Sequence, residues 1–224
     1  RPFAPIALAD RQWPNTLIER APIWMSTDLR DGNQALFEPM NGDRKLRMFR
    51  MLVDIGFKEI EVGFPSASQT DFDFVRYLIE QKQIPDDVWI QVLSPSREAF
   101  IERTFEALKG AKRAIFHLYH AVAPVMRNVV FGMSQDQIVN ELTIPHVRQV
   151  CETMKRFPET IWRFEFSPEM FSNTELEFSR RVVDTVVEVF GATPQNPVII
   201  NLPTTVENAT PNCFADSPVP PFST

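Results

Sequence analysis

Residues 161–167 read Ile-Trp-Arg-Phe-Glu-Phe-Ser, a strand-like run in which aromatic and polar side chains alternate. Successive residues of a β-strand point to opposite faces, so Arg163, Glu165 and Ser167 share one face and the aromatic rings share the other. The same alternation recurs in four other β-rich runs. Their odd-numbered positions bring polar groups to one face, at Glu59, Glu61, Gln91, His117, Tyr119 and Asn201, whereas their even-numbered positions, Phe64 included, are uniformly apolar.

Short β-rich runs alternate with longer amphipathic stretches along the whole chain. We expect strands over residues 23–27, 59–64, 88–93, 113–119, 161–166 and 198–202, and helices over residues 43–55, 71–81, 97–108, 134–156 and 174–190. A strand followed by a helix, repeated about six times, predicts parallel strands joined by right-handed crossovers. The fold class is therefore α/β.

The polar face of the strands favours a barrel over an open sheet. A doubly wound sheet carries helices on both faces, so both faces of its strands would be apolar. The inward face of a barrel opens toward a pocket, where polar side chains are wanted. The phosphate-binding patterns G-x-G-x-x-G and G-x-x-x-x-G-K-S/T are also absent. We predict a (β/α)8 TIM barrel, truncated after about six β/α units.

The composition limits the possible partners and compartments. The 224 residues are 44% hydrophobic and 23% charged, which is typical of a globular chain with an apolar core. A net charge of -6 without a basic run argues against nucleic-acid and anionic-membrane partners. No apolar stretch approaches the roughly 20 residues of a membrane helix, and the start lacks signal-peptide features. We therefore expect a cytoplasmic protein. Cys151 and Cys213 are too few and too isolated for a disulfide framework or a thiolate metal site.

Charged residues follow the first expected strand, in the run Thr-Asp-Leu-Arg-Asp-Gly-Asn-Gln at residues 27–34. Catalytic groups of barrels come from the carboxyl ends of several strands. Other polar groups at these ends are His117, Tyr119, Ser167, Glu169, Asn201 and Thr205. An arginine beside a carboxylate, as at Arg30 and Asp31, suits an anionic oxygen substrate and a divalent cation. The same residues could instead form a solvated charged turn. Glu165 reads as a buried structural acid that pairs with Arg163 or Arg30.

Four stretches of this sequence resemble the long-chain 2-isopropylmalate synthases. They are D-L-R-D-G-N-Q at 28–34, V-G-F-P-S-A-S-Q-T-D-F-D-F-V at 62–75, R-F-E-F-S-P-E at 163–169 and N-L-P-T-T-V-E at 201–207. The D-x-R-D-G motif alone marks the wider group of metal-dependent acyltransferase and lyase barrels, and the other three stretches mark this branch. The resemblance implies a Claisen condensation of acetyl-CoA with 2-oxoisovalerate that gives 2-isopropylmalate, the entry to leucine biosynthesis.

The resemblance also implies roles for individual residues. Asp31 would be the carboxylate ligand of a divalent metal, which would be Mg²⁺, Mn²⁺ or Zn²⁺. Arg30 would stabilise the oxyanion that forms on the keto oxygen, with Gln34 nearby. Glu169 would contact the isopropyl side or take part in proton transfer, and the Thr205 hydroxyl would hold the substrate carboxylate. The implied oxoacid pocket is lined by His117, Tyr119, Ser167 and Glu169 and is closed by Pro203 and Thr205.

The sequence departs from the family pattern in its metal site and its extent. The family completes its metal site with a His-x-His pair, and none of His117, His120 and His146 has this spacing. We divide the chain into a partial catalytic barrel over residues 1–212, with six strands, and a divergent proline-rich tail over residues 213–224. We therefore expect this polypeptide to be inactive alone, whereas the resemblance implies a homodimer for the full-length enzyme.

Two other readings stay open. Homocitrate synthase, citramalate synthase and hydroxymethylglutaryl-CoA lyase share the D-x-R-D-G motif, and they differ in the groups around the side chain of the substrate. The chain could also be a truncated, non-catalytic module.

Overall fold

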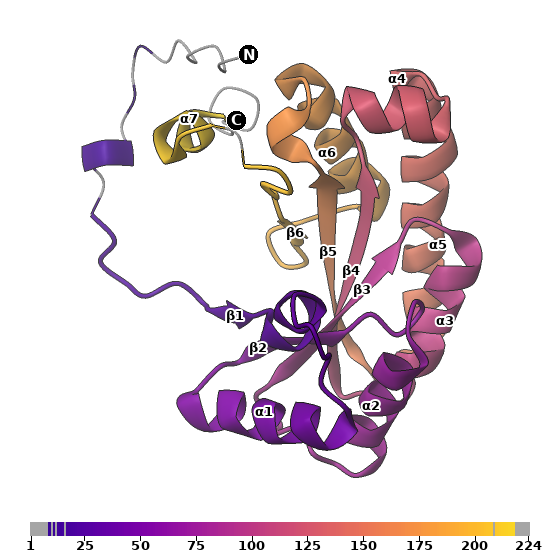
Figure 1. Cartoon of the computed structure of the whole chain (residues 1–224). Helices are drawn as coiled ribbons and strands as arrows, with labels where there is room; N and C mark the ends of the chain where they lie inside the picture. The colour runs from indigo at the N-terminus through magenta and orange to yellow at the C-terminus, as the bar shows by residue number, and fades with distance from the viewer. Residues whose placement is uncertain (1–8, 10, 12, 16, 208, 218–224) are drawn as a thin grey trace.

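Six parallel strands form one half-barrel sheet in the computed structural model, which describes residues 9, 11, 13–15, 17–207 and 209–217 (Figure 1). The strands are β1 (Met25–Ser26), β2 (Glu59–Gly63), β3 (Trp89–Pro95), β4 (Arg113–Ala121), β5 (Ile161–Glu169) and β6 (Val198–Ile200). Their order in space is their order in the chain, and every neighbouring pair is parallel. The predicted barrel architecture with six strands is confirmed.

Helices alternate with these strands as the sequence predicts. They are α1 (Gly42–Ile55), α2 (Gln69–Glu80), α3 (Glu98–Leu108), α4 (Gln135–Gln137), α5 (Ile144–Lys155), α6 (Leu176–Phe190) and α7 (Pro211–Asp216). The helix expected over residues 134–156 is divided, because a π-helical stretch, Ile138–Thr143, separates α4 from α5. Pro145 has no N–H group, so the α-helical hydrogen bond to the carbonyl of Glu141 cannot form there.

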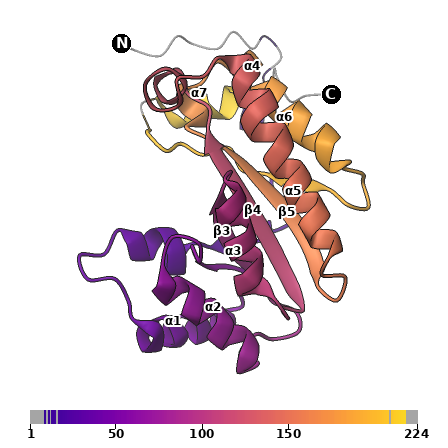
Figure 2. The ribbon, with the colours of Figure 1, turned by 90° about the vertical axis from the view of Figure 1, so that its right-hand side faces the viewer.

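The apolar core lies between the sheet and its outer helices, of which α3 and α5 run side by side (Figures 1 and 2). Even-numbered strand residues supply the sheet side of this core, and Ile90, Phe116 and Phe164 are fully buried. The opposite, odd-numbered face is polar, as predicted. The helices therefore cover one face only and leave the polar face for the inside of the half-barrel.

A bulge in β2 changes the direction of Phe64. Glu61 pairs with Gln91, but the next paired residue of β2 is Gly63, opposite Val92. The extra residue reverses the alternation at the end of the strand. The prediction that Phe64 faces the outer core is therefore wrong: its ring packs edge-on against Tyr119, with centroids 6.1 Å apart.

Two residues near the N-terminus, Arg11 and Trp13, contact α7. Trp13 donates its indole N–H to Asp216 over 2.8 Å, and Arg11 forms an ion pair with the same carboxylate. Part of the expected proline-rich tail is thus helical, since α7 reaches Asp216, and residues 218–224 lie outside the described residues. The domain division at residue 212 stays a prediction. No helix within the described ranges has the length and apolar character to cross a membrane.

Candidate functional site at the carboxyl ends of the strands

A cavity of about 570 Å³ lies at the carboxyl ends of the strands. It is lined by Thr27, Arg30, Asp31, Gln34, Phe64, Leu93, His117, Tyr119, Ser167, Glu169, Asn201, Pro203, Thr204 and Thr205. This set contains the nine residues to which the resemblance assigns a role, and also Asn201, which the sequence analysis placed at the end of a strand. Residues far apart in the chain meet here because parallel strands place their carboxyl ends at the same edge of the sheet.

Arg30 stands on a helical turn, Asp28–Gly32, that directly follows β1. The turn is closed by the Thr27 carbonyl, which accepts the N–H groups of Arg30 and Gly32, each over 3.1 Å. The Arg30 side chain is 16% exposed. Its Nε donates to Glu61 Oε2 over 2.7 Å and its Nη1 to Asp31 Oδ1 over 2.9 Å. Within the described part of the chain, Nη2 has no hydrogen-bond partner, so it is available to a ligand.

A buried ion pair supports the Arg30 turn from below. Lys45, on α1, is fully buried, forms an ion pair with Asp71, and donates to the carbonyl of Leu29 over 3.2 Å. Asp71 in turn accepts the N–H of Phe64 over 2.8 Å. One pair therefore ties together two loops that line the cavity. The sequence analysis missed Lys45, although a lysine on the buried side of an amphipathic helix was a usable signal.

His117 is the centre of a buried polar network across the strands. Its Nδ1 lies 3.3 Å from Glu61 Oε1 and 3.1 Å from the Gln91 amide. Its Nε2 lies 2.6 Å from Ser167 Oγ, which also accepts a hydrogen bond from Asn201 over 2.8 Å. The network thus reaches from β2 to the residue after β6, which fixes these side chains relative to one another.

The carboxyl groups of this network differ in their proton affinity. Burial raises the pKa of Glu61, but hydrogen bonds and opposite charge from His117 and Arg30 outweigh burial and leave it below its ordinary value. Burial raises the pKa of Glu165, and His117 offsets part of this shift. Burial also raises the pKa of Glu169, and burial together with the Glu169 charge raises that of Tyr119. Glu61 is the carboxylate of this set that keeps its charge most readily.

The predicted partner of Glu165 is wrong. Arg163 forms an ion pair with Glu59, and Arg30 pairs with Glu61. Glu165 lies instead 3.4 Å from His117 Nε2, because the parallel register of β4 and β5 places these two residues opposite each other.

Four cavity residues were not assigned to the site from sequence: Thr27, Phe64, Leu93 and Thr204. Leu93 had a usable signal, since it occupies an odd-numbered position on the inward face. Phe64 had none, because a β-bulge cannot be read from the alternation. Together Leu93 and Phe64 give the cavity an apolar wall.

The described residues do not by themselves form a metal site. No three His, Cys, Asp or Glu side chains among them come together to hold an ion. The Asp31 side chain is 66% exposed and pairs with Arg30. A divalent cation needs several ligands, and Asp31 would supply one.

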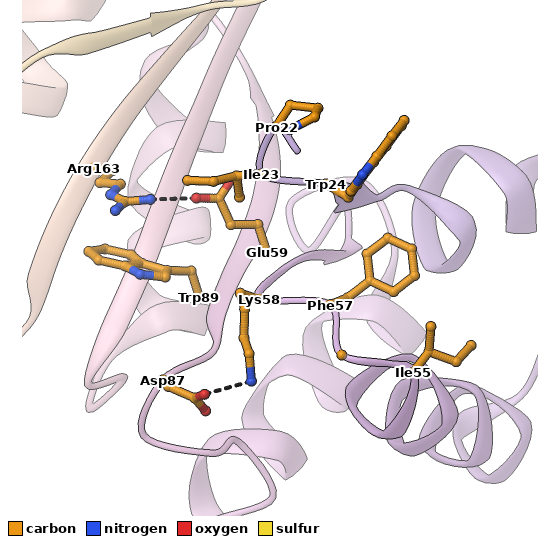
Figure 3. A pocket seen from close by; sticks show the side chains of 11 residues that line it. Pro22, Ile23, Trp24, Ile55, Phe57, Lys58, Glu59, Asp87, Trp89 and Arg163 are labelled. Atoms are coloured by element: carbon orange, nitrogen blue, oxygen red, sulfur yellow. Dashed lines mark hydrogen bonds and ion pairs between the residues drawn. The ribbon is translucent and has the colours of Figure 1, made fainter. Parts of the chain in front are cut away.

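A second cavity, of about 420 Å³, lies at the opposite, amino-terminal ends of the strands (Figure 3). Its walls include Trp24, Trp89 and Ile55. The Arg163 guanidinium lies 4.0 Å from the centre of the Trp89 ring. Active sites of barrels lie at the carboxyl ends of the strands, so the first cavity is the stronger candidate.

Similar proteins agree with this fold. Proteins called 2-isopropylmalate synthase from Parvibaculum lavamentivorans and Ralstonia pickettii are each 59% identical over 216 residues, which are 96% of this chain and 38% of theirs. The chain thus spans about two fifths of the length of these relatives. The solved HMG-CoA lyase of Bacillus subtilis matches with a TM-score of 0.63 at 15% identity, over 88% of this chain and 62% of that one, and shows the fold alone. The family model described as HMGL-like matches residues 21–218, and the chain therefore belongs to the HMGL-like family.

Proposed function

We propose that this chain provides the 2-oxoacid-binding part of a 2-isopropylmalate synthase, which condenses acetyl-CoA with 2-oxoisovalerate in leucine biosynthesis. The names of the relatives at 57–59% identity support the reaction. The observation that carries the proposal is the composition of the first cavity, where one arginine and several hydroxyl groups face an apolar wall. A small, branched and anionic oxoacid fits this combination.

The polar groups of the cavity suit the two oxygen-bearing ends of the substrate. Arg30, whose Nη2 has no partner among the described residues, would stabilise the negative charge that forms on the keto oxygen, with Gln34 beside it. The Thr205 oxygen accepts the N–H of Met170 over 3.2 Å, so its hydrogen is available to the substrate carboxylate. Ser167 would provide a further hydroxyl contact, held in place by His117.

The apolar wall favours 2-oxoisovalerate over the substrates of related enzymes. Leu93 and Phe64 would contact the isopropyl group, and Tyr119 supports the Phe64 ring. A homocitrate synthase binds an oxoacid with a second carboxylate, which needs a cationic or hydrogen-bonding partner at this wall. Pro203 would close the pocket on the other side.

The reaction requires proton transfers in addition to binding. A base removes a proton from the acetyl methyl group, the resulting carbanion attacks the keto carbon, and the oxygen takes up a proton. Water then cleaves the thioester and releases CoA. Glu169 is our candidate for proton transfer, because burial raises its pKa and it lines the cavity.

The proposal includes a divalent metal, Mg²⁺, Mn²⁺ or Zn²⁺, and Asp31 would be a ligand of this metal. The described residues supply this one candidate ligand. A homodimer of the whole enzyme and a cytoplasmic location belong to the same proposal. Cys151 and Cys213 are both free, which fits a reducing compartment.

Isothermal titration with 2-oxoisovalerate tests the proposal. We expect Arg30→Gln to weaken binding at least about tenfold, because a hydrogen bond to a charged group contributes about 1.5–3 kcal/mol. Arg44→Gln is the matched control, since Arg44 is exposed and lies outside the cavity. We further expect no release of CoA when acetyl-CoA is added to this chain. Equal binding by wild type and Arg30→Gln would overturn the proposal, and tighter binding of 2-oxoglutarate would favour the homocitrate reaction.

A further inference from the structure

We propose that Glu61 is a positioning residue that orients both Arg30 and His117 toward the 2-oxoacid. The inference rests on the proposed function and extends it to a residue that does not line the cavity. Glu61 lies on β2, and its side chain is completely buried.

Each oxygen of the Glu61 carboxylate serves a different cavity residue. Oε2 accepts the Nε–H of Arg30 over 2.7 Å, and Oε1 lies 3.3 Å from His117 Nδ1. A buried carboxylate that accepts from both sides restrains both side chains with one rigid group. Arg30 and His117 come from different segments of the fold, so Glu61 sets their separation as well as their orientation.

The charge of Glu61 also determines which nitrogen of His117 carries the hydrogen. An ionised carboxylate can only accept, so Nδ1 must be the N–H side that faces it. The Gln91 amide nitrogen is placed 3.1 Å from Nδ1 and 3.4 Å from Glu61 Oε1, and when the amide is turned its oxygen accepts from Nδ1 instead. In this orientation Gln91 Oε1, a buried oxygen that otherwise lacks a partner in the described part of the chain, accepts the hydrogen bond from Nδ1. Nε2 is left to face Ser167.

The variant Glu61→Gln separates these contacts, and Glu59→Gln is its matched control. An amide has one oxygen and one NH₂ group, so Gln at position 61 presents a donor in place of an acceptor to one of the two partners, Arg30 or His117. Glu59 lies on the same strand, is also buried, and pairs with Arg163 away from the first cavity. Circular dichroism tests whether both variants are folded. Should Glu61→Gln not fold, Glu61→Asp keeps the charge on a shorter side chain and takes its place.

Nitrogen-15 NMR of the histidine rings measures directly which ring nitrogen of His117 carries the hydrogen. The chain has three histidines, so His120→Gln and His146→Gln assign the His117 signals. We expect an N–H signal from Nδ1 of His117 in the wild type and in Glu59→Gln. In Glu61→Gln the hydrogen moves to Nε2, and in Glu61→Asp the Nδ1 signal shifts because the shorter side chain draws the carboxylate away. An unchanged Nδ1 signal in the folded variant at position 61 would overturn the inference.

Binding of 2-oxoisovalerate supplies the second measurement. Glu61→Gln should weaken binding at least about tenfold, and Glu59→Gln should stay within about twofold of the wild type. Equal affinities of the two variants would also overturn the inference. If the wild type does not bind 2-oxoisovalerate, the proposed function fails, whereas the ring-nitrogen signals still test the role of Glu61 in orienting His117.

Discussion

Replacing Lys45 by methionine should lower the free energy of unfolding by about 3 kcal/mol. Lys45 is fully buried, and its ammonium group pairs with Asp71 and donates to the Leu29 carbonyl. Removing one partner of a buried pair typically costs about 3–5 kcal/mol, because the remaining charge loses its compensation. We expect the lower end, since Asp71 is 13% exposed at its side chain and keeps the hydrogen bond from the Phe64 N–H.

Urea unfolding followed by circular dichroism measures this loss. If the free energy of unfolding falls by about 2 kcal/mol per molar urea, a loss of about 3 kcal/mol lowers the urea concentration at the unfolding midpoint by about 1.5 M. Lys112→Met is the matched control, because Lys112 forms an ion pair with Asp86 over 2.8 Å in which both side chains are exposed. It should cost less than about 1 kcal/mol.

The double variant Lys45→Met with Asp71→Asn gives a further check. Asparagine carries no charge and can still accept the Phe64 N–H, so the double variant should be at least about 1 kcal/mol more stable than Lys45→Met alone. The reasoning is refuted if Lys45→Met costs no more than Lys112→Met. It is also refuted if adding Asp71→Asn lowers stability further.

Two more substitutions test the packing and the pH dependence of the fold. Gly63→Ala should lower the free energy of unfolding, measured with urea, by roughly 1–3 kcal/mol, because the Cβ of the alanine would lie 2.9 Å from Cγ of Asp71. A loss below about 0.5 kcal/mol would contradict this prediction. Burial lowers the pKa of His120 to about 4 from 6.5, so the unfolded chain binds the proton first and stability falls as the pH drops through that window, by about 3 kcal/mol in total. In His120→Gln the loss between pH 6.5 and 4 should be smaller, and an unchanged pH profile would refute the assignment.

Alternation along the strands was enough to predict the barrel and the polar inner face. It works because the period of two is set by backbone geometry and does not depend on distant residues. The convergence of Arg30, His117 and Thr205 on one cavity was predictable for the same reason, since parallel strands end at a common edge.

Features that depend on three-dimensional register could not be predicted. The bulge that turns Phe64 into the cavity depends on the pairing of β2 with β3. The partner of Glu165 depends on the register of β4 against β5, which sets it opposite His117. The role of Glu61 could not be predicted either, because its two partners, Arg30 and His117, come from different segments of the chain.

An NMR titration of the labelled chain with 2-oxoisovalerate tests most directly whether the carboxyl ends of the strands form one binding site. We predict that the largest shifts occur together at Arg30, His117, Ser167 and Thr205, with one common affinity. Shifts centred on Trp89 in the opposite cavity, or none at saturating 2-oxoisovalerate, would contradict the account.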